Sequence, residues 1–483
     1  MPISTCRKDA LILFFLLVFV FAYFYQDGKA NANSRFSLIF ASVQEGRLSI
    51  DDYYSKPETK TSDRALFNGH YYSDKAVGPT IAGAVLYLPL YALQHFTNRL
   101  TPGSVKEILT FLVIGLPSAF TGSLIYILCF YLSKNRFRSY LTTLAITLGT
   151  MYFPFSIIFF SHQFTSSLLF WAFFMIFFLK ENAAVRKNGY LFLIGLFLGW
   201  ALISDYPSAV IIVALVLYYL YIIWKKDPYR RWQSIVFPAL GGAIPILVQL
   251  MDNKLSFDNY FSIGYSNLEN PFYMSSMSQG LAGIQWPNLN VLFYTTFHPG
   301  MGIFWQSPVL LLSFIGAVYL FRQRRYRSEA VLAASIICAY SVILSGYFAW
   351  WGSWSFAPRH LIPMLPFFCF FLVFVPDVLN WPFVILSLVS TGQMVIVAAS
   401  NVVTPEDWVT NIATRGIFEF STIYNFGLKQ LLEGHFAQNL GRFLHLNSWA
   451  SLLPFLGVIL GMTLLFFWNE IKRDHAAPVM RTK

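Results

Sequence analysis

The chain has 483 residues, of which 56% are hydrophobic and 19% aromatic, while only 12% are charged. Its mean hydropathy is +0.54. Soluble domains carry about 25% charged residues, so this composition excludes a soluble globular protein, a disordered chain and a fibrous one. With 50 Phe and 27 Tyr, we expect one all-α polytopic membrane domain over residues 1–483, with sizeable loops outside the membrane.

The formal net charge of +11 does not indicate nucleic-acid binding, because the basic residues lie in short runs between apolar segments. Such runs are orientation signals in membrane proteins. The four cysteines have no spacing typical of a metal site or a disulfide framework, and neither a phosphate-binding loop nor a dinucleotide-binding glycine motif occurs. We therefore expect no cofactor, with room left for a divalent cation near Asp74.

The first apolar segment, residues 11–25, follows Arg7 and Lys8. It also fits a signal peptide, with a cleavage-like sequence at residues 30–32. However, the segment stays bulky and aromatic to its end, and the cleavage-like sequence lies several polar residues further on. We interpret it as the first membrane span, with the N-terminus in the cytoplasm.

Eleven further apolar segments bring the expected number of spans to about twelve. They lie at 107–132, 139–160, 163–180, 190–204, 207–224, 233–251, 306–321, 329–347, 360–376, 381–399 and 449–469.

Segment 80–98 is apolar enough to span but is interrupted by Pro89. If it lies along the membrane surface, the short basic loops and both termini face the cytoplasm. The cytoplasmic side then has 20 Lys and Arg and 7 Asp and Glu, and the outer side has 14 Lys and Arg and 16 Asp and Glu. If it spans, nearly all basic clusters point outward, against the positive-inside rule. We therefore expect an interfacial helix. Three long segments then lie outside: 27–106, expected to be catalytic, and 252–305 and 400–448.

The first outer segment ends with the sequence NGHYYSDKAVG, in which Asp74 and Lys75 are adjacent beside His70, Tyr71 and Tyr72. This motif is expected at the depth of lipid head groups. There a cation binds phosphate oxygens strongly, a carboxylate can take a proton from a hydroxyl, and tyrosines can stack on a sugar. The alternative is a solvated loop whose charges only hold it off the bilayer.

Three other polar residues lie at outer ends of spans. Arg359, in YFAWWGSWSFAPRH, opens the next span and is a further phosphate ligand or a snorkelling anchor. Asp205, in SDYP, is a site candidate or a helix cap. His162, in SHQ, is expected mainly as a polar cap.

Three stretches carry a resemblance to a known family. They are NSRF around Arg35 with the following SLIFASVQEGRLSI, then GHYYSDKAVG, and SWSFAPRHLIP around Arg359. These are similar to an acidic-x-Arg-Tyr start, a Tyr-Phe-Glu-Lys-Pro segment and a Gly-Pro-Arg-Tyr motif. The sequence therefore resembles the GT-C membrane glycosyltransferases, nearest to the bacterial aminoarabinose transferase and protein O-mannosyltransferase branch. The likeness covers about the first 130 residues well, and beyond them only the pattern of spans and the SWSFAPRHLIP stretch.

The resemblance implies a GT-C-type fold with interfacial helices in the first outer loop. It also implies transfer of a sugar from a polyprenyl-phosphate-linked donor to an acceptor on the periplasmic side, a cell-envelope glycan, lipid or protein, by inverting displacement. The expected location is the bacterial inner membrane, with both termini cytoplasmic and the active site periplasmic. Lys75 matches the family lysine that contacts the lipid phosphate. The expected donor-binding set is Lys75, Arg35, Arg359, Tyr71, Tyr72 and His70.

The catalytic base is harder to place. The family usually has an acid just after the first span, where this chain has Ala32 and Asn33. The base is therefore expected elsewhere. The candidates, in order, are Asp74, then Asp51, Asp52 and Asp27.

Two alternatives to a transferase remain open. A transporter or lipid flippase would also have about twelve spans, but it predicts ionisable residues deep within them, whereas here they cluster at span ends and in outer loops. An inactive GT-C-like scaffold is the other alternative, because the early acid is missing.

Overall fold

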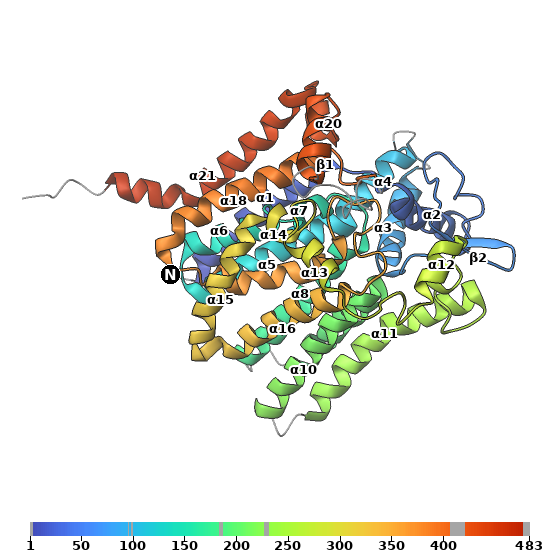
Figure 1. Cartoon of the computed structure of the whole chain (residues 1–483), viewed down its shortest axis with the longest axis horizontal. Coiled ribbons are helices and arrows are strands. Elements are labelled where there is room, and N and C mark those ends of the chain that lie inside the picture. The colour runs from blue at the N-terminus through green and yellow to red at the C-terminus, as the bar shows by residue number, and fades with distance from the viewer. Residues whose placement is uncertain are drawn as a thin grey trace, which may run out of the picture.

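The computed structural model describes residues 3–94, 96–97, 100–182, 187–226, 231–405 and 421–476. These residues form a helical protein with two small antiparallel sheets of two strands each (Figure 1). β1 (Phe24–Tyr25) pairs with β4 (Gln438–Asn439), and β2 (Arg64–Phe67) forms a hairpin with β3 (His70–Ser73). The all-α class expected from the sequence is confirmed.

The α-helices are α1 (Ile3–Tyr23), α2 (Lys29–Gln44), α3 (Gly78–Gln94), α4 (Pro102–Thr110), α5 (Leu116–Ser133), α6 (Arg136–Thr147), α7 (Tyr152–Phe155), α8 (Ser161–Glu181), α9 (Asn188–Ser204), α10 (Ala209–Lys226), α11 (Arg231–Phe257), α12 (Pro271–Met277), α13 (Leu289–Thr296), α14 (Ile303–Gln306), α15 (Leu312–Arg322), α16 (Arg327–Leu344), α17 (Cys369–Leu372), α18 (Asn380–Ala399), α20 (Lys429–Leu432) and α21 (Leu453–Ala476). Tighter or wider turns that matter below are η1 (Phe111–Gly115), η3 (Tyr206–Ser208), η4 (Gly264–Ser266) and η7 (Arg359–Phe368).

Seven helical stretches within the described ranges are long and apolar enough to cross a membrane: Pro102–Ser133, Ser161–Glu181, Tyr206–Lys225, Trp232–Phe257, Arg324–Leu344, Asp377–Ala399 and Ser448–Trp468. Three shorter apolar helices accompany them: Asn188–Ser204, Pro308–Arg322 and Arg359–Leu372. The helix α1 has 21 residues and is apolar after the charges at its start. All twelve predicted segments therefore fall on helices.

One predicted span is not a continuous helix. Segment 139–160 is divided between α6, which ends at Thr147, and the single turn α7. Gly149 and Pro154 explain the break, because glycine costs helix stability and proline lacks the backbone donor. The expected uninterrupted span is wrong here. For the same reason η7, which contains Pro363 and Pro366, begins its segment as a tighter helix.

The basic turns gather at the end of the bundle where α1 begins. Arg136, the first residue of α6, forms an ion pair with Asp9 of α1 at 2.6 Å. Arg325, between α15 and α16, binds Glu181 at the end of α8 at 3.0 Å. These contacts bring basic turns from distant parts of the sequence to one end, as the expected topology requires. Which side of a membrane this end faces stays a prediction.

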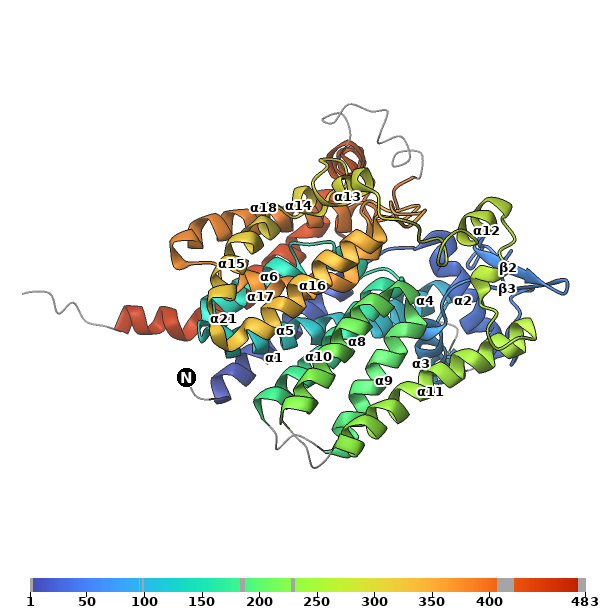
Figure 2. The same ribbon diagram turned by 60° about the horizontal axis from the view of Figure 1, so that its bottom comes forward.

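The first outer segment and the beginning of the second gather at the opposite end (Figures 1 and 2), where α2, α3, α4, the β2–β3 hairpin and α12 lie together. The helix α3 packs on α2, with the Tyr87 ring 5.1 Å from that of Phe40. Val85, Leu88 and Leu93 stay about half exposed on α3. An exposed apolar face suits the predicted interfacial position.

Some predicted features lie outside the described residues. The third outer segment, 400–448, includes residues 406–420, which the structure does not describe. The same holds for four basic residues expected in the cytoplasm: Arg186, Arg230, Arg481 and Lys483.

Candidate functional site

A buried lysine with two carboxylates forms the centre of the candidate site. The Lys75 ammonium lies 2.9 Å from Asp74 Oδ2 and 2.7 Å from Asp63 Oδ2. The Lys75 side chain is only 10% exposed. Burial alone would lower its pKa, but the two carboxylates outweigh burial and raise it. Lys75 is therefore held as a fixed positive charge.

Tight backbone packing holds Asp74 in place. Gly264, in η4, lies so close to Asp74 that a Cβ on it would be 2.7 Å from the Asp74 Cα. A Cβ on Gly78 would be 2.0 Å from Ser204 Oγ at the end of α9. The second outer segment and the end of α9 therefore both lie directly against residues 74–78 of the first outer segment. Each of these contacts requires a glycine, because a Cβ would overlap the neighbouring atoms.

Asp74 is almost completely enclosed. Its Oδ1 accepts a hydrogen bond from Ser34 Oγ of α2 at 3.2 Å, and its Oδ2 binds Lys75. Burial raises the pKa of Asp74, opposed by the charge of Lys75. Both carboxylate oxygens therefore have partners within the protein.

Arg35, next to Ser34 on α2, is also buried. It donates to the Ala76 carbonyl at 2.5 Å and to Ser161 Oγ at the start of α8 at 3.2 Å. No carboxylate of the described residues lies within ion-pair distance of it. Burial lowers the pKa of Arg35, partly offset by Tyr265 and Asp74. Arg35 thus brings a positive charge into a site where no acid neutralises it directly.

Arg359, at the start of η7, is the second buried arginine without an acid. Its side chain is 8% exposed and lies 4.6 Å above the Phe160 ring. Its Nε is buried without a hydrogen-bond partner, and within the described ranges its guanidinium forms no ion pair. Asp63, Tyr265, Tyr347 and Arg35 all act on it electrostatically. It therefore belongs to the same charged cluster as Lys75, and a snorkelling anchor would not be buried in this way.

A histidine–carboxylate pair adjoins these cations. His162 Nδ1 lies 3.0 Å from Asp205 Oδ2, and the His360 ring is 4.8 Å from the His162 ring. For Asp205 the sequence leaves a site candidate or a helix cap open, and for His162 it favours a polar cap. Neither side chain makes a capping hydrogen bond: Phe160 is the N-cap residue of α8, and Asp205, at the junction of α9 and η3, makes no capping bond through its side chain. The capping expectation is therefore wrong for both side chains.

The remaining acidic candidates lie toward the outer hairpin. Asp51 Oδ2 is 2.8 Å from His70 Nδ1, and Asp51 Oδ1 accepts the Tyr71 N–H at 2.7 Å. Burial raises the pKa of Asp51, but the bonds from Tyr71 and His70 outweigh this and lower it. Asp52 pairs with Arg47 and is 64% exposed. The structure does not bring these acids to Lys75, and their catalytic role stays a prediction.

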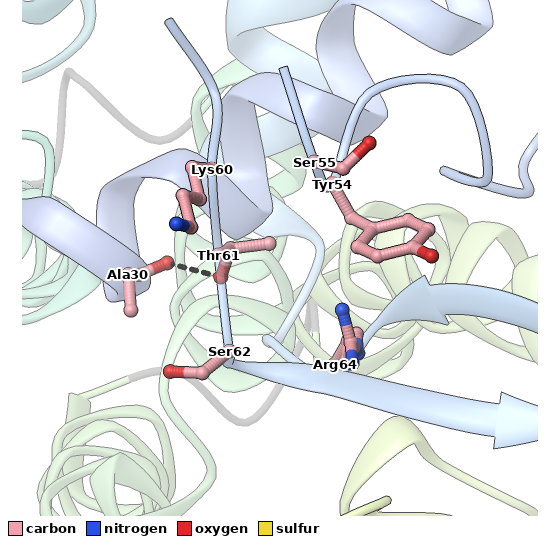
Figure 3. Close-up of a pocket in the computed structure, with 7 residues that line it drawn as sticks. All are labelled: Ala30, Tyr54, Ser55, Lys60, Thr61, Ser62 and Arg64. Atoms are coloured by element: carbon pink, nitrogen blue, oxygen red, sulfur yellow. Dashed lines mark hydrogen bonds between the residues drawn. The ribbon is translucent and has the colours of Figure 1, made fainter. Parts of the chain in front are cut away.

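The aromatic candidates are also engaged at the hairpin. Tyr71 donates to Glu269 at 3.3 Å, and the Tyr72 ring lies 5.3 Å from that of Phe257. Arg64 stacks on Tyr54 at 4.4 Å and on Tyr71 at 4.3 Å. Beside them is an open pocket of about 390 Å³ (Figure 3), in which the Tyr54 ring faces Arg64. It is lined by Ala30, Tyr54, Ser55, Lys60, Thr61, Ser62 and Arg64.

The reserve acid Asp27 lies apart from Lys75. Its Oδ1 is 3.4 Å from the Lys106 ammonium, which also donates to Asn33 Oδ1 at 2.8 Å and to the Glu58 carbonyl at 2.9 Å. Asn33, where the family has an acid, therefore ties α2 to α4. This network fixes the outer loop.

Sequence reasoning missed Asp63 as the second partner of Lys75, and it missed the contacts of His162 with Asp205 and His360. Asp63 reaches Lys75 because the β2–β3 hairpin pairs Arg64 with Ser73. The turn residues Asn68 and Gly69, which both have positive φ, are the local signal that could have predicted this hairpin. His360 follows Arg359 directly but carries no motif of its own. Within the described ranges no three His, Cys, Asp or Glu side chains group as metal ligands, and Asp63 and Asp74 share the Lys75 ammonium. A divalent cation near Asp74 stays untested.

Among solved structures, the chain is similar to ArnT from Cupriavidus metallidurans. The structure of ArnT bound to undecaprenyl phosphate matches with a TM-score of 0.50 and 12% sequence identity, over 96% of this chain and 76% of that chain. ArnT in the apo state matches with a TM-score of 0.45 and 13% identity, over 85% and 68%. No protein-family model and no curated protein matches the chain. The first likeness shows the fold: the chain has the GT-C-type, ArnT-like architecture predicted from its motifs.

Proposed function

We propose that this protein is a membrane glycosyltransferase that moves a sugar from a polyprenyl-phosphate-linked donor to an acceptor. One observation carries the proposal: Arg35 and Arg359 are buried beside Lys75, and neither arginine has an acid partner within the described ranges. Burying an uncompensated charge is costly. Such a cost is understandable if an anion occupies the site during function.

A phosphate fits this anion best. Arginine binds phosphate oxygens in a bidentate manner, and charge-assisted bonds are strong where water is excluded. When the bond between sugar and phosphate breaks, negative charge develops on the phosphate oxygen. Fixed cations stabilise that charge more in the transition state than in the ground state, which is the condition for faster chemistry.

The lipid nature of the donor has two supports. The site lies where outer segments meet the ends of apolar helices, which is where a head group of a membrane lipid would lie. ArnT, whose fold this chain shares, was solved with undecaprenyl phosphate bound. A donor dissolved in the membrane also needs no nucleotide-binding domain.

The displacement needs a group that removes the proton of the acceptor hydroxyl. Asp74 was the first candidate from the sequence, with Asp51 and Asp52 in reserve. Tyr71, Tyr72 and His70 would contact donor or acceptor at the hairpin. The proposed reaction, transfer of a sugar with release of polyprenyl phosphate, is the same whichever acid or histidine of the site removes this proton.

The basic turns give the proposed orientation. By the positive-inside rule they face the cytoplasm, which places both termini there and the site on the periplasmic side of a bacterial inner membrane. The acceptor would then be a cell-envelope glycan, lipid or protein.

The test is a release assay on the purified full chain in detergent. A panel of polyprenyl-phosphate sugars is supplied with and without membrane extract as acceptor, and free polyprenyl phosphate is measured. We expect release by the wild type, loss in Asp74→Asn, and wild-type release in Asp258→Asn, which changes an exposed acid on a surface ion pair. No release with any donor by a folded wild type would overturn the proposal in favour of a transporter or an inactive scaffold.

A further inference from the structure

The pair of His162 and Asp205 is a tertiary contact between two helix ends. His162 is the second residue of α8, and Asp205 directly follows α9. Both side chains are almost fully buried, with 7% exposure each. A buried carboxylate is costly unless it has partners, and the hydrogen bond to His162 is the only one that the described residues give the Asp205 side chain.

The pair has no structural task that explains it. Neither side chain makes a capping hydrogen bond, and the bond joins two helices that already pack along their lengths, α8 and α9. Replacing a buried pair of this kind with apolar side chains is often neutral for stability. A role in chemistry accounts for it better.

The geometry sets the tautomer of His162. A carboxylate that accepts from Nδ1 holds the proton on that nitrogen, which leaves the lone pair on Nε2. Nε2 has no hydrogen-bond partner among the described residues. A base needs this arrangement: an imidazole fixed from behind by an acid, with the other nitrogen free to accept.

The free nitrogen belongs to the proposed phosphate site. Arg359 and Arg35 both act electrostatically on His162, and Asp205 acts on Arg35. His360, adjacent to Arg359, lies 4.8 Å from His162 between ring centres. A sugar joined to a phosphate held by these arginines would lie within the same group of side chains.

We propose that His162, oriented by Asp205, is the base that removes the proton of the acceptor hydroxyl. The acceptor oxygen bonds to the anomeric carbon as the bond from that carbon to the phosphate oxygen breaks. The electron pair leaves with the phosphate, which Lys75, Arg35 and Arg359 hold. The proton goes to Nε2, and Asp205 stabilises the resulting imidazolium. This inference rests on the proposed function and deepens it.

Asp74 then has a different task. Its two oxygens already accept hydrogen bonds from Lys75 and Ser34, and the Lys75 charge favours the ionised carboxylate, which makes it a weaker acceptor for a substrate proton. Nε2 of His162 accepts without breaking any hydrogen bond. Asp74 is therefore a positioning residue for Lys75, and its loss still weakens transfer.

The pH dependence follows from the groups that face the pair. They are Arg359 and His360 on η7, Arg35 on α2, Tyr265 in η4, Tyr340 on α16 and Tyr347 just after α16. The three tyrosines all interact electrostatically with Asp205. Among the described residues, Asp205 is the acid within hydrogen-bonding distance of His162. Activity of the wild type should fall toward acid pH as His162 becomes protonated, and this acid limb should be absent from a variant without the imidazole.

The experiment is the release assay with the active donor, run across a range of pH. His162→Gln and Asp205→Asn are compared with the wild type, and His435→Gln, which changes an exposed histidine, is the matched control. General-base groups contribute about 10²- to 10⁴-fold. We expect a loss of kcat of this size in His162→Gln with unchanged binding of polyprenyl phosphate, a smaller loss with a displaced acid limb in Asp205→Asn, and wild-type kinetics in His435→Gln.

A rescue experiment distinguishes a catalytic role of His162 from a purely structural one. His162→Ala should regain part of its release activity when imidazole is added, because the base is then supplied from solution. Release by His162→Gln within about threefold of the wild type would overturn the assignment and leave the proposed function intact. Equal loss of activity and of polyprenyl phosphate binding, without rescue, would also overturn it. A wild type that releases nothing from any donor would remove both proposals.

Discussion

Lys75 and Asp63 form a 2.7 Å ion pair inside the protein, although they lie in different parts of the first outer segment. Asp74 completes the group on the other side of the ammonium. Two carboxylates therefore contact the single positive charge of Lys75. The neighbouring Arg35 and Arg359 have no acid within ion-pair distance among the described residues. An anionic substrate group can therefore bind beside them without displacing an existing ion pair.

Replacing Lys75 tests the phosphate-binding role. Lys75→Ala should raise the donor KM or lower kcat by about tenfold or more, because a charge-assisted bond to phosphate is worth about 1.5–3 kcal/mol. Steady-state release of polyprenyl phosphate measures both constants. The matched change Lys254→Ala removes an exposed lysine with a surface partner and should alter neither constant. Unchanged kinetics in Lys75→Ala would make this residue only an anchor.

Replacing Arg359 should separate stability from function. Arg359→Met keeps the bulk of the side chain but removes a buried charge that has no acid partner, so the ligand-free protein should unfold at the wild-type temperature or above it. The same variant should lose binding of polyprenyl phosphate. Thermal unfolding in detergent and a lipid-binding assay measure the two effects.

Arg442→Met is the control for Arg359→Met, because Arg442 pairs with Glu107 on the surface. Exposed pairs contribute about 0–1 kcal/mol, so both readouts should stay near wild type. A clear drop in the unfolding temperature of ligand-free Arg359→Met would contradict the idea that this arginine is kept for an anion at a cost to stability.

The close contact of Gly264 with Asp74 predicts a strict requirement for glycine. Gly264→Ala would place a Cβ 2.7 Å from the Asp74 Cα, and relieving such overlap typically costs about 1–3 kcal/mol. We expect a lower unfolding temperature together with weaker transfer, since the strain falls on the residue that holds Lys75. Gly461→Ala, with open space at its Cβ, should unfold no earlier than wild type. Equal behaviour of the two variants would refute the contact.

The ion pair of Arg64 and Glu269 predicts how pH acts on the hairpin. The bond from Arg64 lowers the pKa of Glu269 below its ordinary value of 4.5. Because the folded pKa is depressed, the stabilisation is present above pH 4.5 and is lost as the pH falls through the folded pKa. Hydrogen–deuterium exchange of the peptide covering β2 and β3 should therefore speed up, beyond the intrinsic change, as the pH is lowered below 4.5.

Glu269→Gln provides the comparison for that exchange experiment. This variant lacks the titrating carboxylate, so its hairpin should exchange faster than wild type near neutral pH and show little further change on acidification. Parallel pH profiles in the two proteins would mean that the pair does not hold the hairpin.

The sequence predicted the helical segments well because apolar runs of near-membrane length have few alternatives. It predicted 139–160 poorly because a mean apolar character conceals the effect of Gly149 and Pro154. It brought Asp74, Lys75 and Arg35 into one site through adjacent residues and motifs. The link of Lys75 to Asp63 follows from the β2–β3 hairpin, which the Asn68-Gly69 turn could have indicated. The link of His162 to Asp205 depends on the packing of two helix ends that are distant in the sequence, and no periodicity within either helix encodes it.

The most direct test of the central claim is a structure of the full chain with undecaprenyl phosphate added. We predict density for the phosphate within hydrogen-bonding distance of Arg359 and Lys75, with the lipid tail leaving between the outer ends of the apolar helices. Phosphate bound instead at the basic turns near the start of α1, with the Arg359 site unoccupied at saturating lipid, would contradict the proposed function.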